Sequence, residues 1–232
     1  MPTHTSFVLA LSLTAASFAT LAAQQAPDLA PYLMADRDSE VALARSAAPS
    51  AVTANATVLV FTRTGFVEAA HGGNGFTCLV MRSFGAAPDD PAFWRPSIRG
   101  PMCLNPPAVR TVLPPLLAQV GWALAGATPA QLKAKIAQGY AAKTFPMPAA
   151  GALVYMLSPH QHLSDDADPH WMPHLMFYYD RSVTAAALGA GGFTAPVIDA
   201  VAGDPSSPVQ VIYVPVRTWS DGTPVVRPAP GN

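Results

Sequence analysis

The chain has 232 residues, a formal net charge of −1 and a charged share of only 12 %. This length fits one domain, and a hydrophobic share of 50 % supplies enough apolar residues for a core, which excludes an intrinsically disordered chain. The near-neutral charge excludes binding to nucleic acid through phosphate neutralisation alone. We therefore expect a weakly charged domain with no nucleic-acid partner, and with many loops because 25 residues are proline.

The N-terminus has the pattern of an export signal. Residues 7–23 form an apolar run rich in leucine and alanine, and the first 23 residues contain no Asp, Glu, Lys or Arg. Small residues at its end predict a signal peptide over residues 1–23, cleaved near Ala22 or Ala23. The basic residues that usually precede such a run are missing, so an uncleaved anchor is the alternative. Cleavage predicts a periplasmic or secreted protein with no membrane span.

The first half of the mature chain combines one helix with short strands. After a flexible lead-in at 24–35, a helix is expected over residues 36–47, which either Asp36 or Asp38 can cap. Apolar runs predict strands at 58–62, 66–70 and 76–82, and the short turns between them favour an antiparallel meander. Residues 85–107 are rich in proline and are expected to be irregular.

Two helices and further strands follow. The helices are expected from Pro114 to a stop at Gly126, and from Thr128 to residue 140, where Thr128 and Gln131 form a capping box. In the second helix Lys133 is expected on the solvated face. Strands are predicted at 152–157, 174–179, 196–201 and 209–214, with a short helix at 182–188 that ends at Gly189.

These elements predict an α+β fold. We expect a single domain over 36–222, with a mainly antiparallel sheet of about five to six strands and the two central helices on one face. A proline-rich tail at 223–232 is expected to be loose.

The two cysteines are expected to form a disulfide. Cys78 and Cys103 are an even pair in a chain with an export signal, and oxidising compartments favour disulfides. The bond would tie the proline-rich segment to the third predicted strand. A redox-active or metal-binding thiol pair is the alternative, although no Cys-x-x-Cys motif is present.

One segment is rich in metal-ligand residues. Four of the six histidines lie between positions 160 and 174, together with three aspartates. Imidazole groups bind copper and zinc, and the nearby Met172 and Met176 favour copper. The candidate metal ligands are therefore His160, His162, His170 and His174. The alternative is an ordinary turn, because Asp and His are common in loops.

Aromatic residues beside prolines suggest a second kind of site. Trp94 and Trp171 can floor a pocket for a small ligand, where Arg95 offers a guanidinium to an anionic group. His174 begins an apolar strand and is expected to be partly buried and oriented by an aspartate or a backbone carbonyl. The alternative is that both tryptophans fill the core beneath long loops, and that His174 packs on Trp171.

Five segments together resemble a family of uncharacterised exported bacterial proteins: residues 73–80, 93–96, 101–105, 171–177 and 219–222. The resemblance implies a signal peptide and assigns no catalytic role. No Gly-x-Ser-x-Gly, His-Glu-x-x-His or phosphate-binding loop occurs. These catalytic motifs therefore give no indication of an enzyme, and whether the protein is one stays open.

Two functions are carried forward. The first is an exported module that binds a small molecule or an envelope component. The second is a copper- or zinc-binding protein, or a metal-dependent enzyme, that uses residues 160–176.

Overall fold

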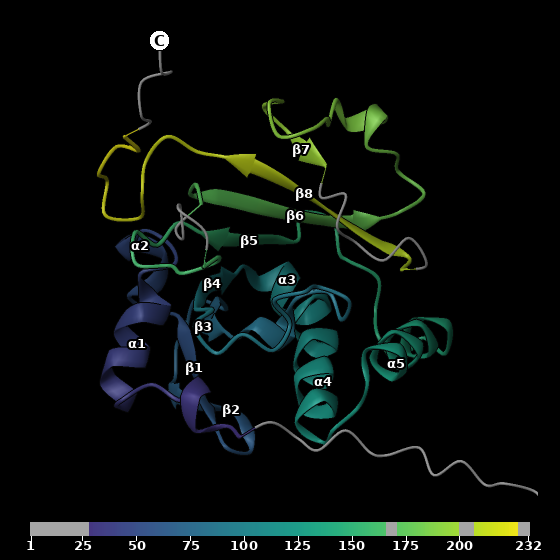
Figure 1. Ribbon diagram of the computed structural model, residues 1–232. Coiled ribbons are helices and arrows are strands. Elements are labelled where there is room, and N and C mark those ends of the chain that lie inside the picture. Colours follow the sequence, from purple (N-terminus) through teal and green to yellow (C-terminus); the bar gives the residue numbers. More distant parts are fainter. Residues whose placement is uncertain (1–27, 166–170, 200–206, 227–232) are drawn as a thin grey trace, which may run out of the picture.

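The computed structural model describes residues 28–165, 171–199 and 207–226 (Figure 1). The predicted signal peptide and His170 lie outside these ranges. None of the helices in the described ranges is long and apolar enough to cross a membrane.

A single mixed sheet forms the centre of the molecule (Figure 1). Its eight strands run in the order β2-β1-β3-β4-β5-β6-β8-β7, rather than the five to six strands expected. Every pairing is antiparallel except that between β1 and β3. The strands are β1 (Thr57–Thr62), β2 (Gly65–Ala70), β3 (Thr77–Met81), β4 (Gly100–Leu104), β5 (Leu153–Met156), β6 (His174–Asp180), β7 (Ile198–Asp199) and β8 (Val209–Pro215).

The expected meander of the first three strands is wrong, because β3 pairs with β1 and not with β2. Residues 71–76 carry the chain from the edge strand β2 past the beginning of β1. The crossing requires a glycine at position 72, because a Cβ there would lie 2.2 Å from the carbonyl carbon of Ala56. The burial explains the order: all five residues of β3 are buried, while β2 exposes Val67 and Glu68. An apolar run is most stable inside the sheet, and the charged strand takes the edge.

Strand β4 lies in the segment that was expected to be irregular. All of its residues are buried, and it pairs with β3 over its full length. The glycine and proline at its start hide the strand pattern, because both residues are rare within strands. Pro101 is accommodated because β4 pairs with β5 only through Cys103 and Leu104, so Pro101 lies where β3 is the only neighbour.

Helices cover both faces of the sheet, because alternate strand residues face opposite sides. Cys78 and Val80 of β3 pack against Ala44 and against the turn that follows it, whereas Leu79 and Met81 belong to a larger core on the other side. The first face carries α1 (Arg37–Arg45) and α2 (Ser50–Thr53). The second carries α3 (Pro106–Thr111), α4 (Leu113–Leu124) and α5 (Pro129–Ala141). The expected central helices are α4 and α5, and they lie on one face as predicted. The described residues contain five α-helices, and α1 and α2 cover the opposite face.

Local capping explains where these helices begin. Asp36 accepts a hydrogen bond from the Ser39 amide at 2.7 Å, and Thr128 forms the expected capping box with Gln131. The unexpected helix α3 starts at Asn105, whose side chain accepts from the Ala108 amide at 3.0 Å. The predicted helix at 182–188 is a single 3-10 turn, Ala186–Leu188, and ends as expected at Gly189 in the left-handed conformation.

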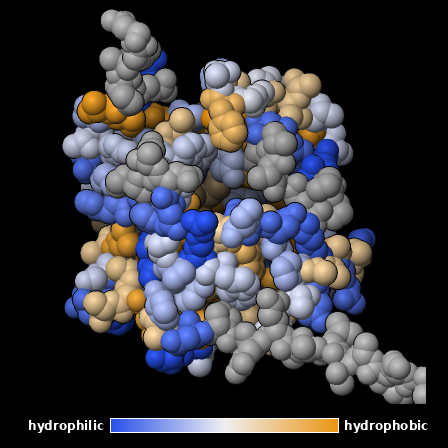
Figure 2. Space-filling model, viewed as in Figure 1, coloured by the Kyte–Doolittle hydropathy of each residue, from blue (hydrophilic) through white to orange (hydrophobic). Residues whose placement is uncertain are grey.

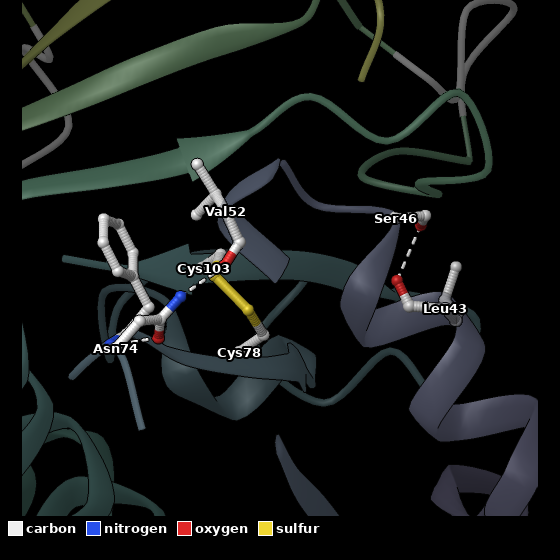
Figure 3. The surroundings of a disulfide bond; sticks show 7 residues. Leu43, Ser46, Val52, Asn74, Cys78 and Cys103 are labelled. Carbon is white, nitrogen blue, oxygen red and sulfur yellow. Dashed lines mark hydrogen bonds between the residues drawn. A yellow bond between two sulfur atoms is a disulfide. The ribbon is translucent and has the colours of Figure 1, made fainter. Parts of the chain in front are cut away.

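The predicted disulfide between Cys78 and Cys103 is confirmed (Figure 3). It joins directly opposite residues of β3 and β4, so it links two central strands rather than a strand and an irregular loop. Both sulfurs belong to the core on the α1 face. In Figure 3 the Asn74 side chain lies beside the bond and donates to the Val52 carbonyl at 2.7 Å, which ties the 71–76 crossing to α2.

A buried ion pair fastens the start of the described chain to the sheet. The Arg82 side chain is fully buried and donates to the Glu40 carboxylate at 3.0 Å and to the Tyr32 carbonyl at 2.7 Å. Glu40 also accepts from the Phe61 amide at 2.9 Å. Tyr32, within the predicted lead-in, is therefore packed into the core, and its hydroxyl donates to the Trp94 carbonyl.

Candidate ligand-binding site

The residues singled out in the sequence fall into separate places. Trp94 packs on Phe84 and Phe93, with ring centroids 6.0 and 4.8 Å away, and lines a shallow hollow beside Pro129. Arg95 donates to the carboxylate of Asp165 at 2.8 Å. The Arg95 guanidinium, which was expected to bind an anionic ligand, is thus already paired with an aspartate of the same chain.

His174 is a buried, neutral side chain. It is 1 % exposed, and its Nδ1–H donates to the Met172 carbonyl at 2.8 Å, one of the two kinds of partner expected. Its ring packs against those of Trp171 and Tyr213, with centroids 4.4 and 5.3 Å away, and these two rings also contact each other. Burial lowers the pKa of His174 to about 4, because a charged imidazolium is poorly solvated there. Trp171 also lines a hollow with Trp219, separate from the hollow at Trp94.

The candidate metal ligands are spread out where they are described. His160 is exposed, while His162 Nε2 donates to Asp165 at 2.9 Å. Hydrogen bonds from His162, Ser97 and Arg95 hold the pKa of Asp165 well below its usual range. In the described part of the chain no three His, Cys, Asp or Glu residues could hold one metal ion. His170 lies outside that part, so the copper or zinc site stays a prediction.

A pocket of about 250 Å³ lies between the second half of the sheet and the two central helices. The sheet wall is formed by β6 and β8, where Tyr178 and Val211 are register partners. The helix wall comes from Leu116 of α4 and Ile136 of α5. The loop after β3, at residues 85–88, closes one side. In Figure 1, α4 and α5 lie on the same side of β6 and β8.

The pocket exists because α5 packs on α4 rather than on the sheet. Leu132 near the start of α5 is completely buried, whereas Ile136 and Ala137 further along the helix are only partly covered. The Tyr140 ring rests on Phe145, with centroids 5.6 Å apart, and this contact holds the end of α5 in place. The apolar side chains between these anchors face the pocket and not another element.

Hydroxyl groups stand among the apolar walls. Tyr140 and Tyr178 both line the pocket, and burial raises the pKa of Tyr140 to about 12 and that of Tyr178 still further. Both side chains are therefore neutral phenols that can donate a hydrogen bond at physiological pH. The Tyr178 hydroxyl donates to the Met176 sulfur at 3.8 Å, and a thioether is a weak acceptor.

The charged side chains among the described lining residues are both cations. Lys133, expected on the solvated face of its helix, is half-buried, lines the pocket and pairs with Asp89 at 2.8 Å. Arg181 follows the end of β6, and its Nε donates to the Ser207 carbonyl at 2.6 Å. The pocket therefore combines apolar walls, two phenols and two cationic groups.

Sequence reasoning did not find this pocket. Its walls come from segments far apart in the chain, around residues 85–88, 112–119, 133–140, 178–181 and 207–211, and none of them carries a recognisable motif. The one available signal is the mixed face of α5, where Ile136 and Tyr140 lie one turn apart beside Lys133. Comparison with known proteins gave no match among family models, curated proteins or solved structures.

Proposed function

We propose that this protein is an exported binding module for a small, mainly apolar molecule held in the pocket between α4, α5, β6 and β8. The observation that carries the proposal is the pocket itself. It is concave, lined mainly by aliphatic and aromatic side chains, and has a few polar groups placed among them, which is the usual composition of a small-molecule site.

The molecular surface supports a small ligand. Figure 2 shows hydrophobic side chains scattered among hydrophilic ones over the face in view, the pattern of an ordinary solvated surface. We therefore place recognition in the pocket, where Leu116, Ile136 and Val211 can shield an apolar molecule from water.

Export to the periplasm or the exterior is the second part of the proposal. It is supported by the apolar run at residues 7–23 and by the disulfide between Cys78 and Cys103, because such bonds persist in oxidising compartments. Intact-mass measurement of exported protein tests this part: a chain that begins after Ala22 or Ala23 is expected, and one that begins at Met1 contradicts it.

Binding is tested with the neutral fluorescent probe N-phenyl-1-naphthylamine, whose emission rises in apolar surroundings. We expect saturable binding to the wild-type protein. Ala137→Trp places an indole in the pocket and should abolish that binding. Ala134→Trp adds the same group to an exposed position of the same helix and should leave binding unchanged.

Two results would refute the proposal. One is the absence of saturable binding to the folded wild-type protein. The other is equal affinity of the Ala137→Trp and Ala134→Trp proteins for the probe, which would place the probe outside the pocket.

A further inference from the structure

We infer that the ligand of this pocket is a neutral alcohol, an apolar molecule whose hydroxyl group donates a hydrogen bond to the side-chain oxygen of Gln119. The inference rests on the proposed function and specifies the ligand class. It follows from the amide of Gln119, whose nitrogen is used within the chain while its oxygen is not.

The orientation of this amide is fixed by the loop after β3. Gln119 lies on α4, one turn from Pro115 and Leu116, and lines the pocket with them. Its Nε2 donates to the carbonyls of Phe84 and Ala86 at 2.9 and 2.7 Å. A carbonyl oxygen can accept only from the nitrogen of the amide, so the oxygen Oε1 has to point away from both carbonyls.

The Oε1 atom of Gln119 is an acceptor without a donor. The residue is only 7 % exposed, and in the described part of the chain no N–H or O–H group donates to Oε1. Unlike the Ser83 hydroxyl, which is buried and unpartnered, this atom keeps contact with solvent. Polar atoms in such largely buried places are normally hydrogen-bonded, so a donor on a ligand in the pocket would stabilise the complex.

The phenols of the pocket suit the same hydroxyl group. Tyr140 and Tyr178 line the pocket, and the Tyr178 hydroxyl donates to the Met176 sulfur at 3.8 Å. A hydroxyl oxygen is a stronger acceptor than a thioether. A ligand hydroxyl has one hydrogen to donate and two lone pairs, so it can serve Gln119 as a donor and a phenol as an acceptor.

The cations beside the pocket favour a neutral head group over an anion, because they already have partners. Lys133 pairs with Asp89 at 2.8 Å, and Arg181 donates to two backbone carbonyls around the start of β8. A carboxylate, moreover, has no hydrogen to donate to Gln119.

The test compares 1-octanol with its isomer 1-methoxyheptane. Both contain an oxygen that accepts hydrogen bonds, but only the alcohol donates one. Both are measured as competitors of the neutral naphthylamine probe. We expect octanol to displace the probe at about fivefold lower concentration, the factor for one neutral hydrogen bond.

Two variants assign this preference to one side chain. Gln119→Met should bind the probe and the ether as the wild-type protein does and lose the preference for octanol. Gln138→Met, the same substitution at an exposed position of α5 outside the pocket, should keep the preference.

A second measurement uses the wild-type chain, because Gln119 also anchors the loop after β3 and its substitution can impair folding. In nuclear magnetic resonance spectra the side-chain amide signals of Gln119 should shift more with octanol than with the ether. The signals of Gln131, which is exposed and outside the pocket, should stay in place with both compounds.

The outcomes separate the two proposals. Equal affinity of the wild-type protein for the two isomers overturns the alcohol and leaves an apolar ligand without a donor in place. The alcohol is overturned in the same way if a folded Gln119→Met protein keeps the preference, or if octanol and the ether shift the Gln119 amide signals alike. If the probe itself does not bind to the wild-type protein, the proposed function fails first.

Discussion

Lowering the pH from 7 to 5 is expected to destabilise the protein by about 2 kcal/mol through His174 alone. An unfolded histidine has a pKa of 6.5, and burial lowers the pKa of His174 to about 4. Between these values the unfolded chain binds a proton that the folded protein does not. The stability that depends on a neutral His174 is therefore fully present above pH 6.5, and this contribution falls by about 1.4 kcal/mol per pH unit toward pH 4.

The measurement is the free energy of unfolding in urea at pH 7 and at pH 5. Carboxyls whose pKa is lowered in the fold, such as Asp36 and Asp221, stay ionised in this window and do not contribute. His174→Asn keeps a donor in the place of Nδ1 for the Met172 carbonyl but does not titrate, so its stability should lose this pH dependence.

His160→Asn is the matched control, because His160 is exposed and its variant should show the wild-type pH dependence. The assignment of this pH dependence to His174 is refuted if His174→Asn and the wild-type protein lose the same free energy between pH 7 and pH 5. That result would mean that the folded protein protonates His174 as readily as the unfolded chain does.

Three further changes test the fold. Glu40→Gln leaves the buried charge of Arg82 without its carboxylate and should cost about 3 kcal/mol or more in urea unfolding, and a change below about 1 kcal/mol would contradict a buried pair. Gly72→Ala should cost about 2–3 kcal/mol, since its Cβ meets backbone at the crossing, whereas Gly121→Ala, where a Cβ has open space, should not destabilise. Removing the disulfide as Cys78→Ala with Cys103→Ala should lower the unfolding free energy by about 3 kcal/mol, and an unchanged value would show that the bond does not constrain the unfolded chain.

Local signals in the sequence were sufficient for the elements that are stabilised locally. The capping box of Thr128 and Gln131 defines α5, and the Asp36 cap defines α1, because both contacts form within one turn of helix. The cysteine pair was also predictable, because the chain has two cysteines and an N-terminal pattern typical of exported proteins, in which disulfides are common. Strand β4, which contains Cys103, was not predictable. Gly100 and Pro101 interrupt the apolar pattern of a strand, and the segment is extended because it pairs with its neighbouring strands.

The candidate site depends on long-range packing and was therefore hidden. Trp94, Trp171 and the histidines attracted attention because of their side chains, yet His174 is a packed core residue and Arg95 pairs with Asp165. The side chain of Lys133 has the spacing of a solvated residue, and it lines the pocket because α5 lies opposite β6 and β8 with the pocket between them. Spacing within one helix does not indicate which element stands opposite.

Chemical-shift mapping by nuclear magnetic resonance tests the pocket most directly. Isotope-labelled wild-type protein is titrated with the neutral probe N-phenyl-1-naphthylamine, and the backbone and indole N–H signals are followed. We predict that the largest shifts gather on Leu116, Ala137 and Val211, while the indole signals of Trp94 and Trp171 stay in place. Shifts that centre on either tryptophan, or no saturable shifts at all, would contradict ligand binding in this pocket.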